Sequence, residues 1–173
     1  MLNNQHPNKT IVYAGSDVFS VQPLKKVLSL KYKKVTVLTR PPKRQGRGMK
    51  EKNNPLAEFA LQNNLETLMP ENPNDNGFLT KLEEKKYDLL ISCAYGRIMS
   101  ERLFGCFHMG NINIHPSLLP RWRGPSPIES SILEGDKITG VSLMQMIEEL
   151  DAGPVYEQRS INMNGENTKT LSE

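Results

Sequence analysis

Cysteine is scarce in this sequence: Cys93 and Cys106 are the two in 173 residues, and no CxxC spacing joins them. Both lie in or beside apolar segments, where a small thiol is usually buried and unreactive. The sequence therefore indicates neither a disulfide framework nor a zinc site, and we expect no metal.

Long hydrophobic runs are absent as well. The first ten residues, MLNNQHPNKT, are polar and lack the apolar centre of a signal peptide. The longest apolar runs fall far short of the roughly 20 residues that cross a membrane as a helix. We therefore expect a soluble protein without a membrane partner, and a chain of 173 residues suits a single domain.

Two common site motifs are also missing. No G-x-G-x-x-G follows the first predicted strand, so the sequence does not support binding of a dinucleotide. No serine or cysteine stands in the setting of a nucleophile, because Ser117 follows a proline and lies outside any G-x-S-x-G. Any chemistry at a histidine is therefore expected to proceed without a covalent intermediate on the protein.

Positive charge is present but concentrated in one stretch. The whole chain carries a net charge of +3, whereas residues 31–52 carry about +8, with nine Lys or Arg against Glu51 alone. Because the stretch also contains Pro41-Pro42 and Gly46-Arg47-Gly48, it is typical of a flexible basic loop that contacts phosphates. A solvated, variable loop would explain the same charge equally well.

Predicted strands and helices alternate along the chain. Apolar and β-branched runs predict strands over 10–14, 35–39, 87–94, 111–115, 140–146 and 155–161. Polar caps and early prolines predict helices from Ser16 or Asp17 to about Leu30, and over 55–63, 78–86 and 127–134. This alternation predicts an α/β, Rossmann-like fold with a mostly parallel sheet and helices on both faces.

Three polar residues form the candidate catalytic group. Asn113 and His115 lie two apart on a predicted strand, so their side chains share one face while isoleucines occupy the other. Asp151 follows a later apolar strand, and ligands of open α/β sheets bind beyond strand ends. A carboxylate orients an imidazole, and an amide donates to an oxyanion, which suits direct transfer of an acyl group. Each residue alone has an ordinary structural reading, as a strand-end histidine, a cap and a turn residue.

The sequence around these residues resembles the folate-dependent formyltransferase family. The resemblance rests on NIHPSLLPRWRG (113–124), on Gly135-Asp136 and Thr139-Gly140-Val141, and on Leu150-Asp151-Ala152-Gly153. It covers nearly the whole chain. The runs RWRGPSPI (121–128) and GVSLMQM (140–146) are similar to the methionyl-tRNA branch of that family.

The resemblance implies a reaction and its site. The donor would be 10-formyltetrahydrofolate, and the acceptor the α-amino group of methionine on initiator tRNA. Asn113 would stabilise the oxyanion, His115 would handle the proton and Asp151 would hold His115. The folate would be bound by Ser117, Leu118, Leu119 and Pro120, and its pterin by Tyr95, Gly96, Arg97 and Ile98. The tRNA would be contacted by Arg47, Lys43, Arg44 and Lys50.

The resemblance also implies a domain organisation. Residues 1–173 would form the catalytic domain of a monomer, which family members extend with a further helix and a separate tRNA-binding β-barrel. We expect a mitochondrial matrix protein in a eukaryote and a cytoplasmic one in a bacterium. Two alternatives stay open: a formyltransferase for a small amine, such as a sugar nucleotide or glycinamide ribonucleotide, and a folate- or RNA-binding remnant without activity.

Overall fold

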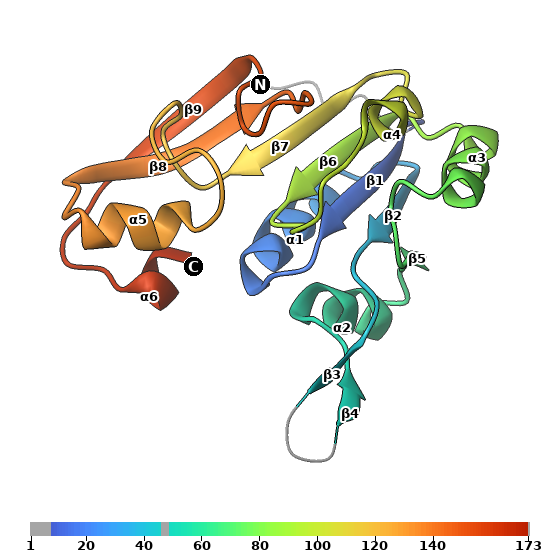
Figure 1. Ribbon diagram of the computed structural model, residues 1–173, viewed down its shortest axis with the longest axis horizontal. Helices are drawn as coiled ribbons and strands as arrows, with labels where there is room; N and C mark the ends of the chain where they lie inside the picture. The colour runs from blue at the N-terminus through green and yellow to red at the C-terminus, as the bar shows by residue number, and fades with distance from the viewer. Residues whose placement is uncertain (1–7, 46–48, 173) are drawn as a thin grey trace. The chain divides into compact units, whose positions relative to one another are not determined.

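The computed structural model describes residues 8–45 and 49–172 (Figure 1). The chain divides into two compact units, Met1–Gly110 and Asn111–Glu173, called here the N-terminal unit and the C-terminal unit. Each combines strands with helices, and the predicted α/β fold with a mostly parallel sheet is confirmed.

The N-terminal unit is built on a parallel sheet. β1 (Thr10–Gly15) lies between β2 (Lys34–Leu38) and β6 (Leu89–Cys93), and β5 (Thr67–Leu68) pairs with β2. Almost every residue of β1 and β6 is buried. This confirms the expectation that an apolar run such as LLISC belongs to a strand covered on both faces.

Side-chain caps mark the start of four of the five helical segments described in this unit, and α1 is the exception. The five helical segments are a 3-10 turn (Val18–Ser20), α1 (Val21–Ser29), α2 (Pro55–Gln62), α3 (Asn76–Lys85) and α4 (Glu101–Gly105). The carboxylate of Asp17 accepts from the Phe19 N–H, as predicted for the first helix start, and Asp75 caps α3 by accepting from Phe78. Such caps satisfy donors that have no partner within the helix.

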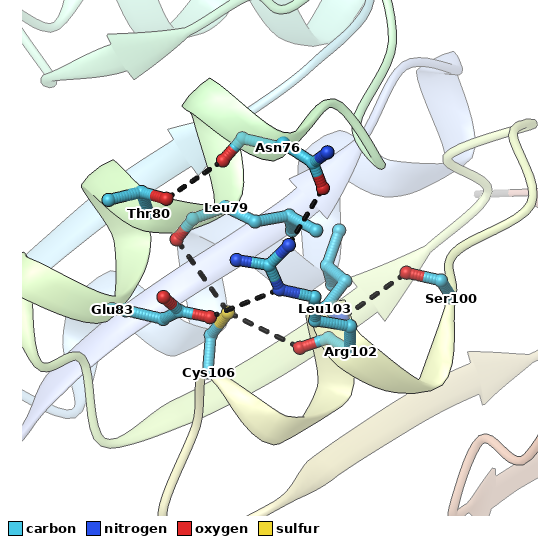
Figure 2. A network of polar contacts seen from close by, with 8 residues as sticks. All are labelled: Asn76, Leu79, Thr80, Glu83, Ser100, Arg102, Leu103 and Cys106. Carbon is cyan, nitrogen blue, oxygen red and sulfur yellow. Dashed lines mark hydrogen bonds and ion pairs between the residues drawn. The ribbon is translucent and has the colours of Figure 1, made fainter.

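Helix α4 is tied to α3 by polar contacts (Figure 2). Arg102 donates to the Asn76 side chain over 2.7 Å and forms an ion pair with Glu83 over 3.3 Å. Cys106 lies at the end of α4 with its thiol near the Arg102 carbonyl. Burial raises the pKa of the Cys106 thiol and raises that of Cys93 to about 12, and both free cysteines are buried, as expected.

The basic stretch contains a hairpin where a flexible loop was predicted. β3 (Lys43–Gln45) and β4 (Lys50–Lys52) pair antiparallel, so the loop prediction is wrong for these residues. The error has a simple cause: the strands are made of charged and amide residues, and no alternation of apolar side chains marks them.

The C-terminal unit is antiparallel. β7 (Asn111–His115) pairs with β8 (Ile138–Met144), which pairs with β9 (Val155–Asn162). α5 (Pro127–Leu133) precedes β8, and α6 (Thr168–Ser172) follows β9. Every residue of β9 is exposed. Among helices in the described ranges, none is long and apolar enough to cross a membrane.

Candidate active site

Strand β7 carries a row of polar side chains on one face. Asn111, Asn113 and His115 alternate with Ile112 and Ile114, so the predicted sharing of one face holds. His115 is only 4% exposed, which makes it a buried imidazole that needs hydrogen-bond partners.

The loop between β8 and β9 brings Asp151 to β7. Its two ends are joined by a hydrogen bond from the Gln145 N–H to the Pro154 carbonyl. Gly153 packs against Gln145 so closely that a Cβ at this position would collide with the Gln145 carbonyl. Asp151 itself has a left-handed backbone, with φ of 48°, which is uncommon for a residue with a side chain. Loop 145–154 is therefore held tightly in one shape.

The three predicted catalytic residues meet within the C-terminal unit. The Asn113 amide donates to Asp151 Oδ1 over 3.5 Å, and His115 Nδ1 lies 3.6 Å from Asp151 Oδ2. The Asp151 side chain is about 10% exposed. An amide, an imidazole and a carboxylate thus form one cluster, although Asp151 lies 38 residues after Asn113 in the sequence.

The second nitrogen of His115 contacts the main chain. Nε2 lies 2.9 Å from the Trp122 carbonyl oxygen, and because a carbonyl only accepts, Nε2 must carry a hydrogen in this contact. With Nε2 protonated, Nδ1 faces the Asp151 carboxylate. The two ring nitrogens of His115 therefore have different neighbours, a carbonyl oxygen at Nε2 and a carboxylate at Nδ1.

The segment 121–124 is fixed from two sides. The Gly124 N–H donates to Asp151 Oδ2 over 2.9 Å, which satisfies the carboxylate from the side away from Asn113. Asp136 accepts from the Trp122 indole N–H and from the Arg121 guanidinium, and these hydrogen bonds, with Arg121 the stronger influence, lower the pKa of Asp136 to about 2. The Trp122 carbonyl is thereby positioned by contacts on both sides of it.

The expected folate turn lies directly after β7. Ser117 donates to the Arg121 carbonyl over 2.6 Å, and the Ser142 hydroxyl joins the Ser117 carbonyl to the Leu119 N–H. Gln158 donates to the Leu119 carbonyl over 2.9 Å. Ser117 and Leu119 are thus anchored to β8 and β9, and Leu118 and Pro120 belong to the same turn.

The four residues expected at the pterin lie in the N-terminal unit, directly after β6. They are Tyr95, Gly96, Arg97 and Ile98. Tyr95 is buried, which raises its pKa to about 12, and its hydroxyl has no hydrogen-bond partner among the residues that the structure describes. Arg97 donates to the carbonyls of Pro70 and Glu71, whereas Ile98 is 85% exposed.

The four residues expected to contact tRNA belong to the hairpin region. Lys43, Arg44 and Lys50 lie on β3 and β4 with exposed side chains. Arg47 falls outside the described residues.

Three contributors to the cluster were missed in the sequence. Asn111 accepts the Met146 N–H over 2.6 Å and so holds the start of loop 145–154. Its two-residue spacing from Asn113 was a usable signal. The other two contributors are main-chain groups, the Trp122 carbonyl and the Gly124 N–H, and no residue type predicts them.

Comparison with known proteins places this arrangement among formyl transferases. The family model described as formyl transferase matches residues 11–172. Methionyl-tRNA formyltransferase from Buchnera aphidicola is 39% identical over 94% of this chain and 52% of its own length, and that from Nitrosomonas eutropha is 43% identical over 87% and 48%. This chain therefore spans about half the length of these curated relatives. The solved phosphoribosylglycinamide formyltransferase from Bacillus halodurans has the same fold, with a TM-score of 0.73 at 22% identity, over 95% of this chain and 86% of that one.

Proposed function

Because this chain belongs to the formyl transferase family, we propose that it transfers the formyl group of 10-formyltetrahydrofolate to the α-amino group of methionine on initiator tRNA. The names and the identities of the curated relatives support this acceptor. The structural likeness to a glycinamide enzyme concerns the fold and does not favour its acceptor.

The cluster of Asn113, His115 and Asp151 is the observation on which the proposal chiefly depends. The folate supplies the formyl group, and attack by an amine makes its oxygen increasingly negative. The Asn113 amide has two hydrogens and uses one toward Asp151, so the other is available for that oxygen. Asn113 is therefore the proposed oxyanion donor.

His115 is the proposed acceptor of the proton that the amine loses, and it would pass this proton to the folate nitrogen as the old C–N bond breaks and tetrahydrofolate leaves. Nδ1 faces Asp151, and the resulting imidazolium would be stabilised by a carboxylate that the Gly124 N–H holds in place. The Trp122 carbonyl fixes the ring from its other side. Asp151 thus acts through His115 as a positioning residue and also orients Asn113.

The residues proposed to bind folate are described for each unit by itself. The anchored turn Ser117–Pro120 offers rigid main-chain groups beside the catalytic cluster. In the N-terminal unit, the buried Tyr95 hydroxyl lacks a partner within the described part of the chain, and a buried polar group of this kind suits a ligand that supplies one. Gly96, Arg97 and Ile98 would line the same region.

The proposed tRNA contact is the hairpin. Lys43, Arg44 and Lys50 expose positive charge on β3 and β4, and a phosphate backbone is attracted to such a surface. Arg47, which lies outside the described residues, completes the proposed set. For the whole molecule we still expect a monomer that includes a tRNA-binding domain. We expect it in the cytoplasm of a bacterium or in the mitochondrial matrix of a eukaryote.

Formylation of charged initiator tRNA by this chain, with 10-formyltetrahydrofolate as donor, tests the proposal directly. We expect Asn113→Ala and His115→Ala each to lower the rate by about 10²–10⁴-fold, because each removes a group that acts on the reacting atoms. Glu129→Gln is the matched control, since it changes an exposed carboxylate on α5 of the same unit. Circular dichroism should show that all variants fold.

A panel of acceptors separates the proposed acceptor from small amines. Equal amounts of protein would be supplied with methionyl-tRNA, glycinamide ribonucleotide and an amino-sugar nucleotide. Formylation of a small amine but not of methionyl-tRNA would overturn the acceptor, and wild-type rates in the Asn113 or His115 variant would overturn the assigned site.

A further inference from the structure

The loop that carries Asp151 is attached to β7 at a point beyond the paired strands. Pairing between β7 and β8 ends at Asn113 and Met144. Two residues further along this antiparallel register, Asn111 stands opposite Met146, where β8 has already ended. There the Asn111 side-chain oxygen, in place of a main-chain carbonyl, accepts the Met146 N–H over 2.6 Å. A side chain thus continues the contact between the two segments after regular pairing stops.

The start of this loop is fixed on two sides. Asn111 is only 5% exposed, and a donor that loses its acceptor in such surroundings is costly. The neighbouring N–H of Gln145 donates to the Pro154 carbonyl over 2.9 Å. Two successive N–H groups are therefore held, one by β7 and the other by the far end of the loop.

Between Met146 and Asp151 the loop has little support of its own. Residues 147–150 are all exposed, and within residues 8–45 and 49–172 their one hydrogen bond is from the Ala152 N–H to the Glu149 carbonyl. The left-handed backbone of Asp151 persists only where the surrounding structure supports it. A shift of the loop at Met146 would therefore move Asp151, because hydrogen bonds do not tie the intervening residues to the rest of the unit.

Small movements of Asp151 matter because its contacts with the other two members of the cluster are long. The Asn113 amide lies 3.5 Å from Oδ1, and His115 Nδ1 lies 3.6 Å from Oδ2. The usual hydrogen-bond range is about 2.7–3.2 Å, so an outward displacement would remove both contacts. The Gly124 N–H also holds this carboxylate, over 2.9 Å, and a partial effect is therefore expected when the anchor on β7 is lost.

We propose that Asn111 is a positioning residue of the active site. Through the Met146 N–H it fixes loop 145–154 against β7, and thereby sets the distance between the Asp151 carboxylate and His115. Asn111 itself touches no reacting atom. That the atoms of this cluster react in formyl transfer rests on the proposed function, whereas the positioning of Asp151 against His115 can be measured without it.

Two substitutions separate the acceptor oxygen from the space that the side chain fills. Asn111→Leu fills a similar space without an acceptor, whereas Asn111→Asp keeps an oxygen at the same position. Thr139→Val is the matched control, since it changes another buried polar residue of the same sheet, at the end of β8 remote from the loop. Circular dichroism should show that all three variants fold.

Nuclear magnetic resonance tests the positioning without folate or tRNA. The chain has three histidines, so its imidazole nitrogens give few signals. We expect the Met146 N–H to exchange with solvent faster in Asn111→Leu than in wild type, because it loses its acceptor. The His115 Nδ1 signal should move as its carboxylate neighbour is displaced. Asn111→Asp and Thr139→Val should stay closer to wild type in both measurements. An unmoved His115 signal in Asn111→Leu would overturn the positioning role even if activity fell.

The kinetics of formyl transfer test the consequence for the reaction. We expect Asn111→Leu to lower kcat by about 10–100-fold, because a misplacement of about 1 Å in a catalytic geometry can cost about 10²-fold. The KM for folate should stay near the wild-type value, since the turn after His115 keeps its anchors. Asn111→Asp should recover most of the rate. Equal kcat values in Asn111→Leu and Asn111→Asp would overturn the role of the acceptor oxygen.

The two measurements also separate this proposal from the proposed function. If the His115 signal moves in Asn111→Leu while the acceptor panel shows no formylation of methionyl-tRNA, Asn111 keeps its positioning role and the proposed function fails. If methionyl-tRNA is formylated and Asn111→Leu retains the wild-type kcat, the proposed function stands and the positioning role is overturned.

Discussion

The interiors of the two units contain different kinds of side chain. Nearly all the buried hydrophobic residues, among them Tyr13, Leu24 and Leu90, lie in the N-terminal unit. In the described part of the C-terminal unit, only Leu119, Ile128 and Met144 belong to that class. Both units bury polar residues, but in the C-terminal unit these outnumber the buried hydrophobic ones: Asn111, His115, Ser117, Ser131, Thr139 and Ser142.

This difference matters for how stability and the candidate chemistry are related. An apolar core is stabilised by burial, which has no direction, and it tolerates changes that keep volume and hydrophobicity. A polar interior depends on each donor meeting its acceptor. In the C-terminal unit the Ser142 hydroxyl joins β8 to the turn after His115, so one substitution there can affect both stability and the site.

The largest change in stability is expected from the apolar core. Leu90 on β6 is fully buried, and Leu90→Ala should lower the free energy of unfolding by about 2–5 kcal/mol, because it removes buried methyl groups and leaves a cavity. Urea unfolding followed by circular dichroism measures this. A loss below about 1 kcal/mol would mean that the N-terminal unit depends less on its core than the burial pattern indicates.

A smaller loss is expected from the polar interior. Ser142→Ala leaves the Ser117 carbonyl and the Leu119 N–H without their shared hydroxyl, at a cost of about 1–3 kcal/mol. The rate of formyl transfer should also fall, because the turn after His115 loses its anchor. Ser130→Ala is the control: its hydroxyl contacts only its own helix in the described structure, and little change is expected in stability or rate. Equal rates of formyl transfer in Ser142→Ala and Ser130→Ala would contradict the expectation that the Ser142 hydroxyl helps to orient the site.

The smallest effect is expected at Asp88, where the N-terminal unit has a polar contact of its own. Burial alone would raise the pKa of Asp88, but hydrogen bonds from Thr10 and Lys9 outweigh it and lower the pKa from 3.8 to about 2. The ionised carboxylate therefore stabilises the fold above about pH 4, and this contribution is lost as the pH falls toward 2.

Asp88→Asn should accordingly cost about 1–2 kcal/mol at pH 7, because the amide keeps only part of the hydrogen bonding of the carboxylate. The difference from wild type should vanish near pH 2. Melting temperatures of the wild type and of Asp88→Asn, measured between pH 2 and pH 7, report both the cost at pH 7 and its loss in acid. A difference that grows as the pH falls would contradict the assigned direction of the pKa shift.

Sequence patterns predicted the regular elements where side chains alternate or cap. The run LLISC indicated β6, and Asp17 indicated the first helix start. The short pieces were not predicted, because β5 contains two residues and α4 five, too few for a period to emerge. The hairpin was missed because its strands pair through charged residues, and pattern reasoning treats such residues as loop.

The candidate site was predicted in its residues but not in its geometry. The spacing of Asn113 and His115 sufficed to place both on one face of β7. The approach of Asp151 depends on its left-handed backbone and on the absence of a side chain at Gly153. These are properties of a folded loop, and composition does not reveal them.

Trp122 makes one contact through its side chain and another through its main chain. Its indole contacts Asp136, whereas its carbonyl oxygen contacts His115. Replacing the side chain leaves the carbonyl in the chain, so an alanine scan would not remove the acceptor that faces the imidazole. Robustness to substitution at position 122 would therefore say nothing about whether that contact matters, and a change to the peptide bond itself, such as an ester in place of the following amide, is what would weaken it.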